Sequence, residues 1–481
     1  MQLPTLGGSN LVNQSRFLEE CRKIIGGGYV YTSTIDKNPY LTDWNKRFSG
    51  EAIAVLKPKD VGEVSALVSL CRLYKIAIVP QGGNTGLCGG ATPSNQHLSV
   101  VICTTRLNKI IEVNIENSTI TLEAGVILNH AQEAAKRAGR LFPLSLTSEG
   151  SCTIGGNLAT NAGGVQVLHY GSMRDLALGL EVVTPTGEIF NGLRGLRKDN
   201  TGYSLKDIYI GSEGTLGIIT AATLKIFPLP RSKATALVAL ANAESSIKLL
   251  QLTEGLCNAH LTAFELISTR ALQLIEGQEK NLGDLTSVKS DWSVLLELSS
   301  MEGEENSSAE LESLLEKALD ENFIIDAVIS KSLKQSIEIW NLRESIPERQ
   351  LTLGTIIKHD ISLPISEIVE FIRSTEIKLQ KFWPNLQTII FGHVGDGNLH
   401  YNIAPSLPEY SKELEERRHE INLLVHDEVY KYSGSFSAEH GIGQLKRDEL
   451  VQRKSVIEMQ LMRGLKQAFD PEGIMNPGKI L

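Results

Sequence analysis

Hydrophobic and polar positions along the first half of the chain alternate between the periods of strands and of helices. Two short apolar runs, residues 52–57 and 76–79, predict buried strands. Between them an amphipathic pattern predicts a helix that reaches Tyr74, and Asp60 and Glu63 stand at capping-box spacing at its start. This part of the chain is therefore expected to alternate strands with helices.

The same alternation continues toward a proline-rich junction. Residues 110–113 and 119–123 predict a hairpin, and residues 128–138 predict a helix that Gly139 ends. Two prolines within Phe227–Arg231 are typical of a boundary between domains.

Longer helical patterns dominate beyond this junction. Amphipathic segments over residues 309–321, 411–430 and 457–469 predict helices, and residues 388–391 predict a buried strand. The whole pattern favours an α+β protein of two domains followed by a C-terminal segment.

Composition narrows the classes of function. The 481 residues carry a formal net charge of −9, whereas phosphate-backbone binding requires a basic face, so no nucleic-acid partner is expected. No apolar run approaches the roughly 18 to 20 residues of a transmembrane segment. The N-terminus lacks a secretory or mitochondrial targeting pattern, which favours a cytoplasmic, bacterial-type location. Six scattered cysteines form no CxxC pair, so an iron–sulfur or zinc-ribbon site is not expected.

Three glycine-rich stretches indicate a ligand-binding region. Gly82 and Gly83 directly follow a predicted strand, where the backbone can approach a ligand closely and direct its N–H groups at phosphate oxygens. Further stretches cover residues 150–164 and 210–220. One such loop alone is commonly a tight turn, but three in one region favour a binding site. None has GxGxxG or Walker spacing, which disfavours a Rossmann or P-loop site.

These stretches resemble the flavoproteins of the vanillyl-alcohol-oxidase type, and the likeness covers nearly the whole chain. The resemblance implies that Pro80–Gly86 holds the FAD pyrophosphate, that Gly150–Gly164 follows the pyrophosphate and the ring, and that Glu213–Thr220 serves the adenine side. Members that attach FAD covalently use a histidine of the first loop. Gly83 and Asn84 stand there in this chain, which implies non-covalent FAD. The implied FAD contacts are Gln81, Gly82, Gly83, Asn84, Thr85, Gly86, Gly150, Ser151, Ile154, Gly155, Gly156, Asn157, Thr160, Asn161, Glu213, Gly217, Ile219 and Asn476.

Two histidines bracket a glycine-rich turn farther along the chain. Strand alternation places His400 and Asn402 on one face, and the turn sequence Gly395–Asn398 allows a hairpin that brings His393 and His400 together. Glu439 follows about forty residues later. Two imidazoles and one carboxylate form a familiar catalytic metal set, which zinc, manganese, iron or cobalt can occupy.

Each of these residues also has a simpler interpretation. A histidine near a turn is commonly a hydrogen-bonded structural residue, although two histidines with a downstream Glu439-His440 pair make this less favoured. Asp396 is either a further ligand or, as is usual for an aspartate between glycines, a turn residue or a hydrogen-bond partner of a ligand.

The same residues match the FAD-dependent D-2-hydroxyacid dehydrogenases, in particular those that act on D-2-hydroxyglutarate. The resemblance implies that His393, His400 and Glu439 bind a divalent metal, for which zinc is the expected ion. It also implies that Asn402 binds the substrate and that His440 is the catalytic base.

Two cations upstream match the substrate subsite of the hydroxyglutarate enzymes. The resemblance implies that Arg343 and Lys358 bind the distal carboxylate of the substrate. The hydroxyl residue of that subsite is replaced by Pro347, and Ser345 is a candidate substitute. The alternative for the two cations is a surface ion pair with a neighbouring carboxylate.

The expected reaction is oxidation of a D-2-hydroxy acid, D-2-hydroxyglutarate above all, to the 2-oxo acid. The metal would hold the C1 carboxylate and the C2 hydroxyl, His440 would take the hydroxyl proton, and FAD would accept the hydride. Because the chain has no iron–sulfur motif, electrons would leave to an external acceptor such as an electron-transfer flavoprotein, a quinone or a cytochrome. A D-lactate or glycolate dehydrogenase, a non-redox flavin-dependent transferase and a non-catalytic FAD-binding subunit stay open as alternatives.

The resemblance also implies a domain organisation. A vanillyl-alcohol-oxidase-type (PCMH-type) FAD-binding domain is expected over residues 1–230, and an α+β substrate (cap) domain that carries the metal histidines over residues 231–430. A C-terminal helical segment over residues 431–481 is expected to pack back on the FAD site. The sequence is compatible with a homodimer.

Overall fold

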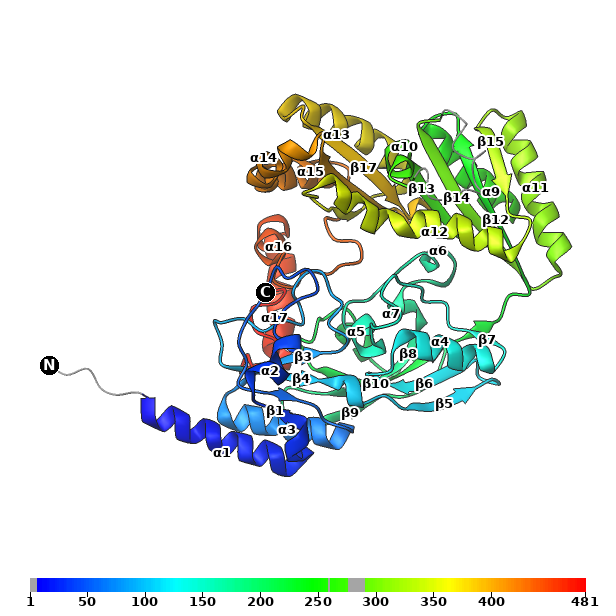
Figure 1. Ribbon diagram of the computed structural model, residues 1–481. Helices are drawn as coiled ribbons and strands as arrows, with labels where there is room; N and C mark the ends of the chain where they lie inside the picture. The colour runs from blue at the N-terminus through cyan, green and yellow to red at the C-terminus, as the bar shows by residue number, and fades with distance from the viewer. Residues whose placement is uncertain (1–6, 258–259, 276–289) are drawn as a thin grey trace. The chain divides into compact units, whose positions relative to one another are not determined.

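The chain folds into two compact units (Figure 1). The structure is a computed structural model that describes residues 7–257, 260–275 and 290–481. Unit 1 contains residues 1–162, 172–227 and 440–481, and unit 2 contains residues 163–171 and 228–439. Unit 1 thus combines the glycine loops with the end of the chain. The expected domain boundaries at residues 230 and 430 stay a prediction.

Unit 1 contains two main sheets. The first has the strand order β1-β2-β4-β3, in which the β2–β4 and β4–β3 pairs are parallel. The second is antiparallel and has the order β5-β6-β10-β8-β9. The strands numbered up to 11 are β1 (Val30–Tyr31), β2 (Val55–Leu56), β3 (Ala77–Gln81), β4 (Ser99–Cys103), β5 (Ile110–Asn114), β6 (Thr119–Glu123), β7 (Arg140–Leu141), β8 (Ala177–Val183), β9 (Ile189–Asn191), β10 (Ile218–Lys225) and β11 (Phe227–Pro228).

Short-range signals set the elements of unit 1. The Asp60 side chain accepts a hydrogen bond from the backbone N of Glu63, which confirms Asp60 as the N-cap. The reciprocal bond of a capping box is not formed, because the Glu63 carboxylate accepts from the backbone N of Lys59 instead of that of Asp60. The predicted hairpin is confirmed as β5 and β6. The predicted strand over 52–57 is shorter than expected, because only Val55 and Leu56 pair with neighbouring strands. The helices are α1 (Gly7–Ile25), α2 (Thr34–Lys37), α3 (Val61–Tyr74), α4 (Leu128–Arg137), α5 (Ile154–Ala159), α7 (Met173–Leu176), α8 (Leu205–Tyr209), α16 (Arg447–Arg453) and α17 (Val456–Phe469).

Residues 440–481 complete unit 1. The backbone N of Ile78 in β3 donates to the carbonyl of Ile474 (2.8 Å), and the backbone N of Asn476 donates to the carbonyl of Ile78 (2.7 Å). Ile474 is buried in the core that includes α3 and β3. The end of the chain therefore lies beside the strand that leads into the Pro80–Gly86 loop.

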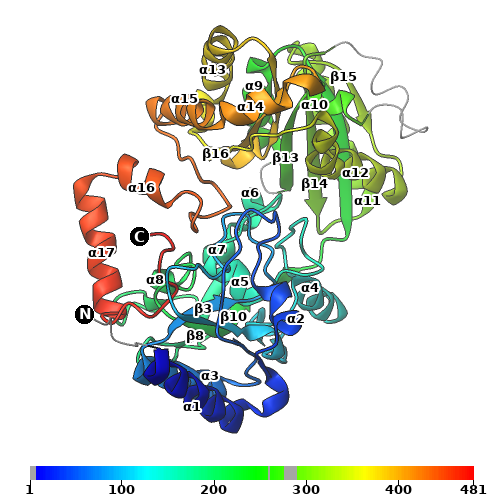
Figure 2. The same cartoon turned by 60° about the vertical axis from the view of Figure 1, so that its left-hand side comes forward.

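Unit 2 is built on one antiparallel sheet of seven strands in the order β15-β12-β14-β13-β17-β18-β16 (Figures 1 and 2). Strands far apart in the sequence are neighbours in it, since β13 pairs with both β14 and β17. The strands are β12 (Ser232–Leu240), β13 (Leu261–Ser268), β14 (Trp292–Ser300), β15 (Ile324–Ile329), β16 (Asp360–Ser362), β17 (Leu386–Gly392) and β18 (Asn398–Pro405).

Helices cover both faces of this sheet. One face packs its apolar side chains against α9, α11, α13 and α15, and the other packs against α10 and α12. Because side chains alternate along a strand, the strands β12, β13, β14, β17 and β18 each contribute to both cores. The helices are α6 (Val167–Tyr170), α9 (Glu244–Cys257), α10 (Thr269–Gln273), α11 (Glu304–Asp320), α12 (Leu333–Arg349), α13 (Ile368–Phe382), α14 (Ser411–Glu416) and α15 (Arg418–Lys431).

The helix predicted over residues 411–430 is divided in two. α14 ends at Glu416 and α15 begins at Arg418, because Arg417 has φ −89° and ψ 0°, which turns the backbone out of regular helix geometry. The amphipathic period alone does not report such a bend.

Candidate flavin and metal sites

The first glycine loop of unit 1 forms one wall of a pocket. Loop Gly82–Gly86 leaves β3, and the pocket is closed by α5, by the residues before β10 and by His440. The predicted FAD contacts that line it are Gln81, Gly82, Gly83, Asn84, Thr85, Gly86, Gly155, Gly156, Asn157, Thr160, Glu213, Gly217 and Ile219.

This pocket fits a dinucleotide. Among the described residues, no backbone N–H of Gly82–Gly86 donates to a protein atom, so five donors are available to phosphate oxygens. A Cβ on Gly82 would lie 2.2 Å from Oγ1 of Thr153, and one on Gly83 would lie 2.1 Å from the carbonyl O of Ser151. Only glycine allows the two loops to approach this closely. The buried Oγ1 of Thr153, which lines the pocket, has no hydrogen-bond partner among the described residues.

Five of the predicted FAD contacts are not among the described residues that line the pocket, namely Gly150, Ser151, Ile154, Asn161 and Asn476. The side chain of Asn476 instead donates to the carbonyls of Gly90 (2.9 Å) and Glu213 (2.7 Å), both of which line it. Asn476 therefore holds two residues of the pocket wall through its side-chain amide.

Glu213 holds the chain directly after His440. Its Oε1 accepts a hydrogen bond from the backbone N of Ile442 (2.7 Å), and its Oε2 accepts one from Gly443 (2.8 Å). Burial raises the pKa of Glu213, and these two hydrogen bonds oppose the rise. Gly441 has φ +73°, and a Cβ there would lie 2.7 Å from the carboxylate. The side chain predicted to contact FAD thus also anchors the segment that carries the proposed base.

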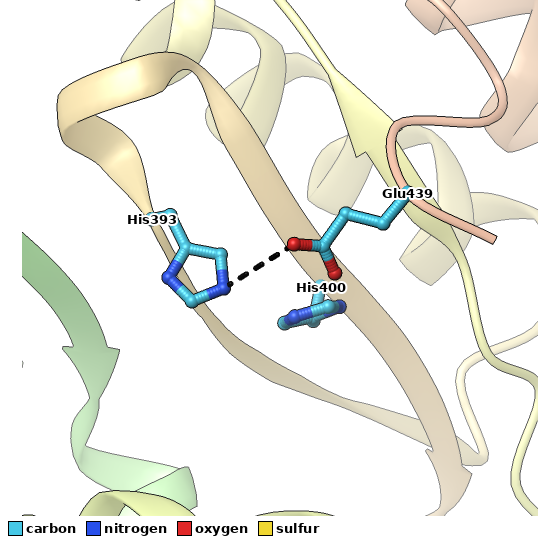
Figure 3. A group of neighbouring side chains, drawn as sticks. All are labelled: His393, His400 and Glu439. Atoms are coloured by element: carbon cyan, nitrogen blue, oxygen red, sulfur yellow. Dashed lines mark ion pairs between the residues drawn. The ribbon is translucent and has the colours of Figure 1, made fainter. Parts of the chain in front are cut away.

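The three residues predicted to bind a metal lie close together in unit 2. Strands β17 and β18 form the predicted hairpin, which places the rings of His393 and His400 5.8 Å apart between centroids. Figure 3 shows both imidazoles and the Glu439 carboxylate turned toward one another, with 3.7 Å between Nε2 of His393 and Oε1 of Glu439. One ligand atom from each of the three residues lies within 4.8 Å of the others. Asp396 serves the turn, where its Oδ1 accepts a hydrogen bond from the backbone N of Asn398 (3.0 Å).

A buried carboxylate on β13, that of Glu265, pairs with His393 of this group. Glu265 is fully buried; one oxygen pairs with Nδ1 of His393, and the other accepts a hydrogen bond from Nε of Arg343 (2.6 Å). Burial opposes the charge on Glu265, but His393 and Arg343 outweigh it and lower its pKa to about 2. Burial likewise opposes the charge on His393, and Glu265 raises its pKa to about 9.

Asp360 on β16 is a second carboxylate that contacts this group. One carboxylate oxygen accepts a hydrogen bond from the backbone N of Glu439 (2.9 Å), and the other lies 3.9 Å from Nδ1 of His400. Burial raises the pKa of Glu439 to about 7 against the opposing charge of His393, and Asp360 adds to the rise. A bound cation would relieve this concentration of negative charge, so the donor set fits a divalent metal.

The three residues predicted to bind the substrate differ in their burial and in their contacts. Lys358 is exposed and has no ion-pair partner among the described residues, whereas Arg343 is buried against Glu265. Asn402 is buried, and its side chain donates to Oε1 of Gln350 (2.9 Å). The β16–β18 register places Asp360 opposite His400, so Lys358, Asp360, His400 and Asn402 share one face of the sheet.

The candidate hydroxyl residue Ser345 is engaged within its own helix. Oγ of Ser345 donates to the carbonyl of Leu342 (2.9 Å), so its proton is used within α12. Pro347 lies inside the same helix and removes the N–H that would otherwise bond the carbonyl of Arg343.

Glu265 and Asp360 were not predicted from the sequence as site residues. Glu265 is the single charged residue of an eight-residue strand, Leu261–Ser268, that is otherwise apolar or hydroxylic. A lone charge in a buried strand needs a partner, which is the signal that could have found it. Asp360 follows Lys358 by two positions and would have been found from strand alternation.

Comparison with known proteins gives the class. Residues 52–192 match the family described as "FAD binding domain", and residues 229–480 match "FAD linked oxidases, C-terminal domain". The structure of p-cresol methylhydroxylase with substrate bound aligns with a TM-score of 0.76 at 17% identity, over 98% of this chain and 97% of that one. The α+β fold of the vanillyl-alcohol-oxidase-type flavoproteins is thereby confirmed, and FAD is the cofactor.

Two relatives narrow the class to one family. The chain is 36% identical over 444 residues to the mitochondrial D-2-hydroxyglutarate dehydrogenase of Arabidopsis thaliana, which covers 92% of this chain and 77% of that protein. It is 35% identical over 451 residues to the D-2-hydroxyglutarate dehydrogenase of Xanthomonas citri pv. viticola, with 93% of each chain covered. The chain belongs to the FAD-linked D-2-hydroxyacid dehydrogenase family. Among its described residues, no helix is long and apolar enough to cross a membrane.

Proposed function

We propose that this protein oxidises a D-2-hydroxy acid, D-2-hydroxyglutarate in the first place, to the 2-oxo acid and passes the electrons to an external acceptor. The observation that carries the proposal is the group of His393, His400 and Glu439, whose ligand atoms lie within 4.8 Å of one another. Glu439 is joined by a peptide bond to His440, which lines the flavin pocket. The end of the metal group and a residue of the flavin pocket are therefore consecutive in the chain.

Each cofactor supplies one part of the chemistry. Bound FAD supplies a hydride acceptor, which the free N–H groups of Gly82–Gly86 would hold by its phosphates. A divalent metal held by His393, His400 and Glu439 supplies positive charge that makes the hydroxyl proton of a hydroxy acid easier to lose.

The chain's own residues would move the proton and orient the substrate. We assign His440 as the general base that accepts the C2 hydroxyl proton, because its imidazole lines the flavin pocket. Asn402 would orient the acid group from the sheet face that also carries His400. Lys358 and Arg343 would bind the distal carboxylate and so hold C2 in place.

Anaerobic flavin reduction tests the proposal. Protein loaded with FAD and zinc is mixed with D-2-hydroxyglutarate, D-malate or D-lactate, and bleaching of the flavin absorbance is followed by stopped flow. D-2-hydroxyglutarate should reduce the flavin fastest, and the L enantiomer serves as control. Absence of bleaching with all three D acids would refute the proposal.

D-lactate or glycolate is the second candidate substrate. Arg343 already shares its charge with the buried carboxylate of Glu265, which leaves Lys358 as the more available cation for a distal carboxylate. A monocarboxylic acid requires less positive charge at this end of the site. The ratio of kcat/KM for D-2-hydroxyglutarate and D-lactate decides between the two.

Two other classes and the partners are tested separately. A non-redox transferase or a non-catalytic FAD-binding subunit would not bleach an artificial electron acceptor in the presence of a D-2-hydroxy acid. The natural acceptor, whether an electron-transfer flavoprotein, a quinone or a cytochrome, stays a prediction. So do the homodimer and the cytoplasmic location.

A further inference from the structure

One buried carboxylate contacts two side chains with different proposed roles. Glu265 has a side-chain exposure of 0%, and its two oxygens pair with His393 and Arg343, whose side chains are 8% and 7% exposed. His393 belongs to the metal group, and Arg343 to the proposed substrate subsite. A charge this deeply buried is stable only when it is paired, so Glu265 constrains both partners.

The contact with His393 sets how this imidazole presents itself. Nδ1 of His393 faces Glu265, which leaves Nε2 on the side of Glu439, 3.7 Å from its Oε1. A carboxylate behind a metal-binding histidine fixes the ring orientation and the position of its proton, and increases the basicity of the nitrogen that faces the metal.

The contact with Arg343 fixes the orientation of its guanidinium group. Nε of Arg343 donates to Glu265 at 2.6 Å, and the guanidinium carbon lies 4.8 Å from the centroid of the Phe391 ring. The ring of Phe391 is in turn 5.0 Å from that of His400. Arg343 is therefore joined to one metal-type histidine through Glu265 and to the other through Phe391.

We propose that Glu265 is a positioning residue that couples the metal-binding histidine His393 to the substrate-binding Arg343. The inference rests on the proposed function, in which these two residues serve the metal and the distal end of the substrate. In this proposal Glu265 acts only through its two partners, with which both of its oxygens pair. Its substitution should weaken metal binding and reduce discrimination between dicarboxylic and monocarboxylic substrates together.

The test uses Glu265→Gln in the full chain, with a matched control on the neighbouring strand. Glu297 on β14 is also buried, and its carboxylate contacts Lys233 (2.9 Å) and Nε1 of Trp340 in α12 (3.0 Å). Glu297→Gln therefore removes a buried charge that is tied to the same helix, and among the described residues Glu297 forms no hydrogen bond or ion pair with His393 or Arg343.

Two quantities are measured on both variants. The first is the free zinc concentration that half-loads metal-free protein in a metal buffer, which needs no activity. The second is the KM for D-2-hydroxyglutarate and for D-lactate at saturating zinc. For Glu265→Gln the half-loading concentration should rise by about 10- to 100-fold, the range found for partners of metal ligands. Its KM for D-2-hydroxyglutarate should rise by roughly tenfold, because Arg343 loses the partner that orients it toward the distal carboxylate, and its KM for D-lactate by much less.

The outcomes separate this inference from the proposed function. Wild-type zinc affinity and substrate discrimination in Glu265→Gln would overturn the coupling, and so would equal effects in Glu297→Gln. If His400→Ala binds zinc as tightly as the wild type, the metal site of the proposed function is wrong instead. Thermal unfolding of each variant identifies one that fails to fold, and Glu265→Asp then takes its place as a variant that keeps the charge but shortens the reach to both partners.

Discussion

His393 and Glu265, 128 residues apart in the chain, form a buried ion pair that joins the residue directly after β17 to the adjacent strand β13. The pair directs Nδ1 of the imidazole away from Glu439, so that only Nε2 faces the other proposed ligands. A histidine that binds a metal usually donates its other ring N–H to such a partner, which holds the ring in one tautomer. The arrangement makes specific predictions about metal, proton and substrate.

Loss of one proposed ligand should remove the metal but leave the flavin. His400→Ala removes one of the three proposed metal ligands. Zinc affinity should therefore fall by more than the roughly 100-fold seen when a residue that only hydrogen-bonds to a metal ligand is replaced. Elemental analysis after dialysis measures zinc, and the flavin spectrum measures FAD. The pocket of unit 1 contains neither histidine of the hairpin, so loss of both cofactors would contradict separate sites.

Zinc affinity should depend on pH in a defined direction. Bound metal requires a neutral His393 and an ionised Glu439, whose pKa values in the metal-free protein are about 9 and about 7. Between pH 9 and pH 7 the metal displaces the proton of His393, so affinity should fall about tenfold per pH unit as the pH is lowered. Below pH 7 the proton on Glu439 makes the fall steeper. A flat titration with a zinc-selective dye from pH 9 to pH 6 would contradict these values.

His440→Ala should slow chemistry without removing FAD. If His440 accepts the hydroxyl proton, the rate of flavin reduction should drop by about 10²- to 10⁴-fold at pH 7. The flavin content and the zinc content of the variant should match those of the wild type. Stopped-flow reduction at the wild-type rate would exclude His440 as the base.

Lys358 should determine the preference for a second carboxylate. Among the described residues it has no ion-pair partner, so Lys358→Met should raise the KM for D-2-hydroxyglutarate by about tenfold or more, while that for D-lactate changes little. Lys334→Met on α12 is a control, because Lys334 is 81% exposed and pairs with Glu338. Equal increases for both acids would remove Lys358 from the distal subsite.

Gly441 should be required for the segment that follows His440. At φ +73° an alanine would be strained, and its Cβ would lie 2.7 Å from Oε1 of Glu213, so Gly441→Ala should destabilise unit 1 by about 1–3 kcal/mol. Gly464→Ala in α17 is the matched control, because nothing lies within 4 Å of its added Cβ. That change should stabilise by roughly 0.5–1 kcal/mol. Thermal unfolding of both variants checks the difference, and equal stability would contradict it.

The elements that depend on neighbours in sequence were predictable. The Asp60 N-cap of α3 and the hairpins β5–β6 and β17–β18 each rest on residues within a few positions of one another. The same holds for the alternation that puts His400 and Asn402 on one face. The bend at Arg417 was not predictable, because one backbone conformation between two helical turns leaves the amphipathic period unchanged.

The sequence by itself determined which side chains are available for chemistry: the glycine loops, the two histidines of the turn, and Glu439 followed by His440. Only the tertiary structure decided how they are held. Glu265 reaches His393 and Arg343 because β13 pairs with β17 beneath α12, and Glu213 reaches Ile442 from 229 residues away. Such contacts depend on strand order and burial, and no local pattern of residues encodes the partner of a buried charge.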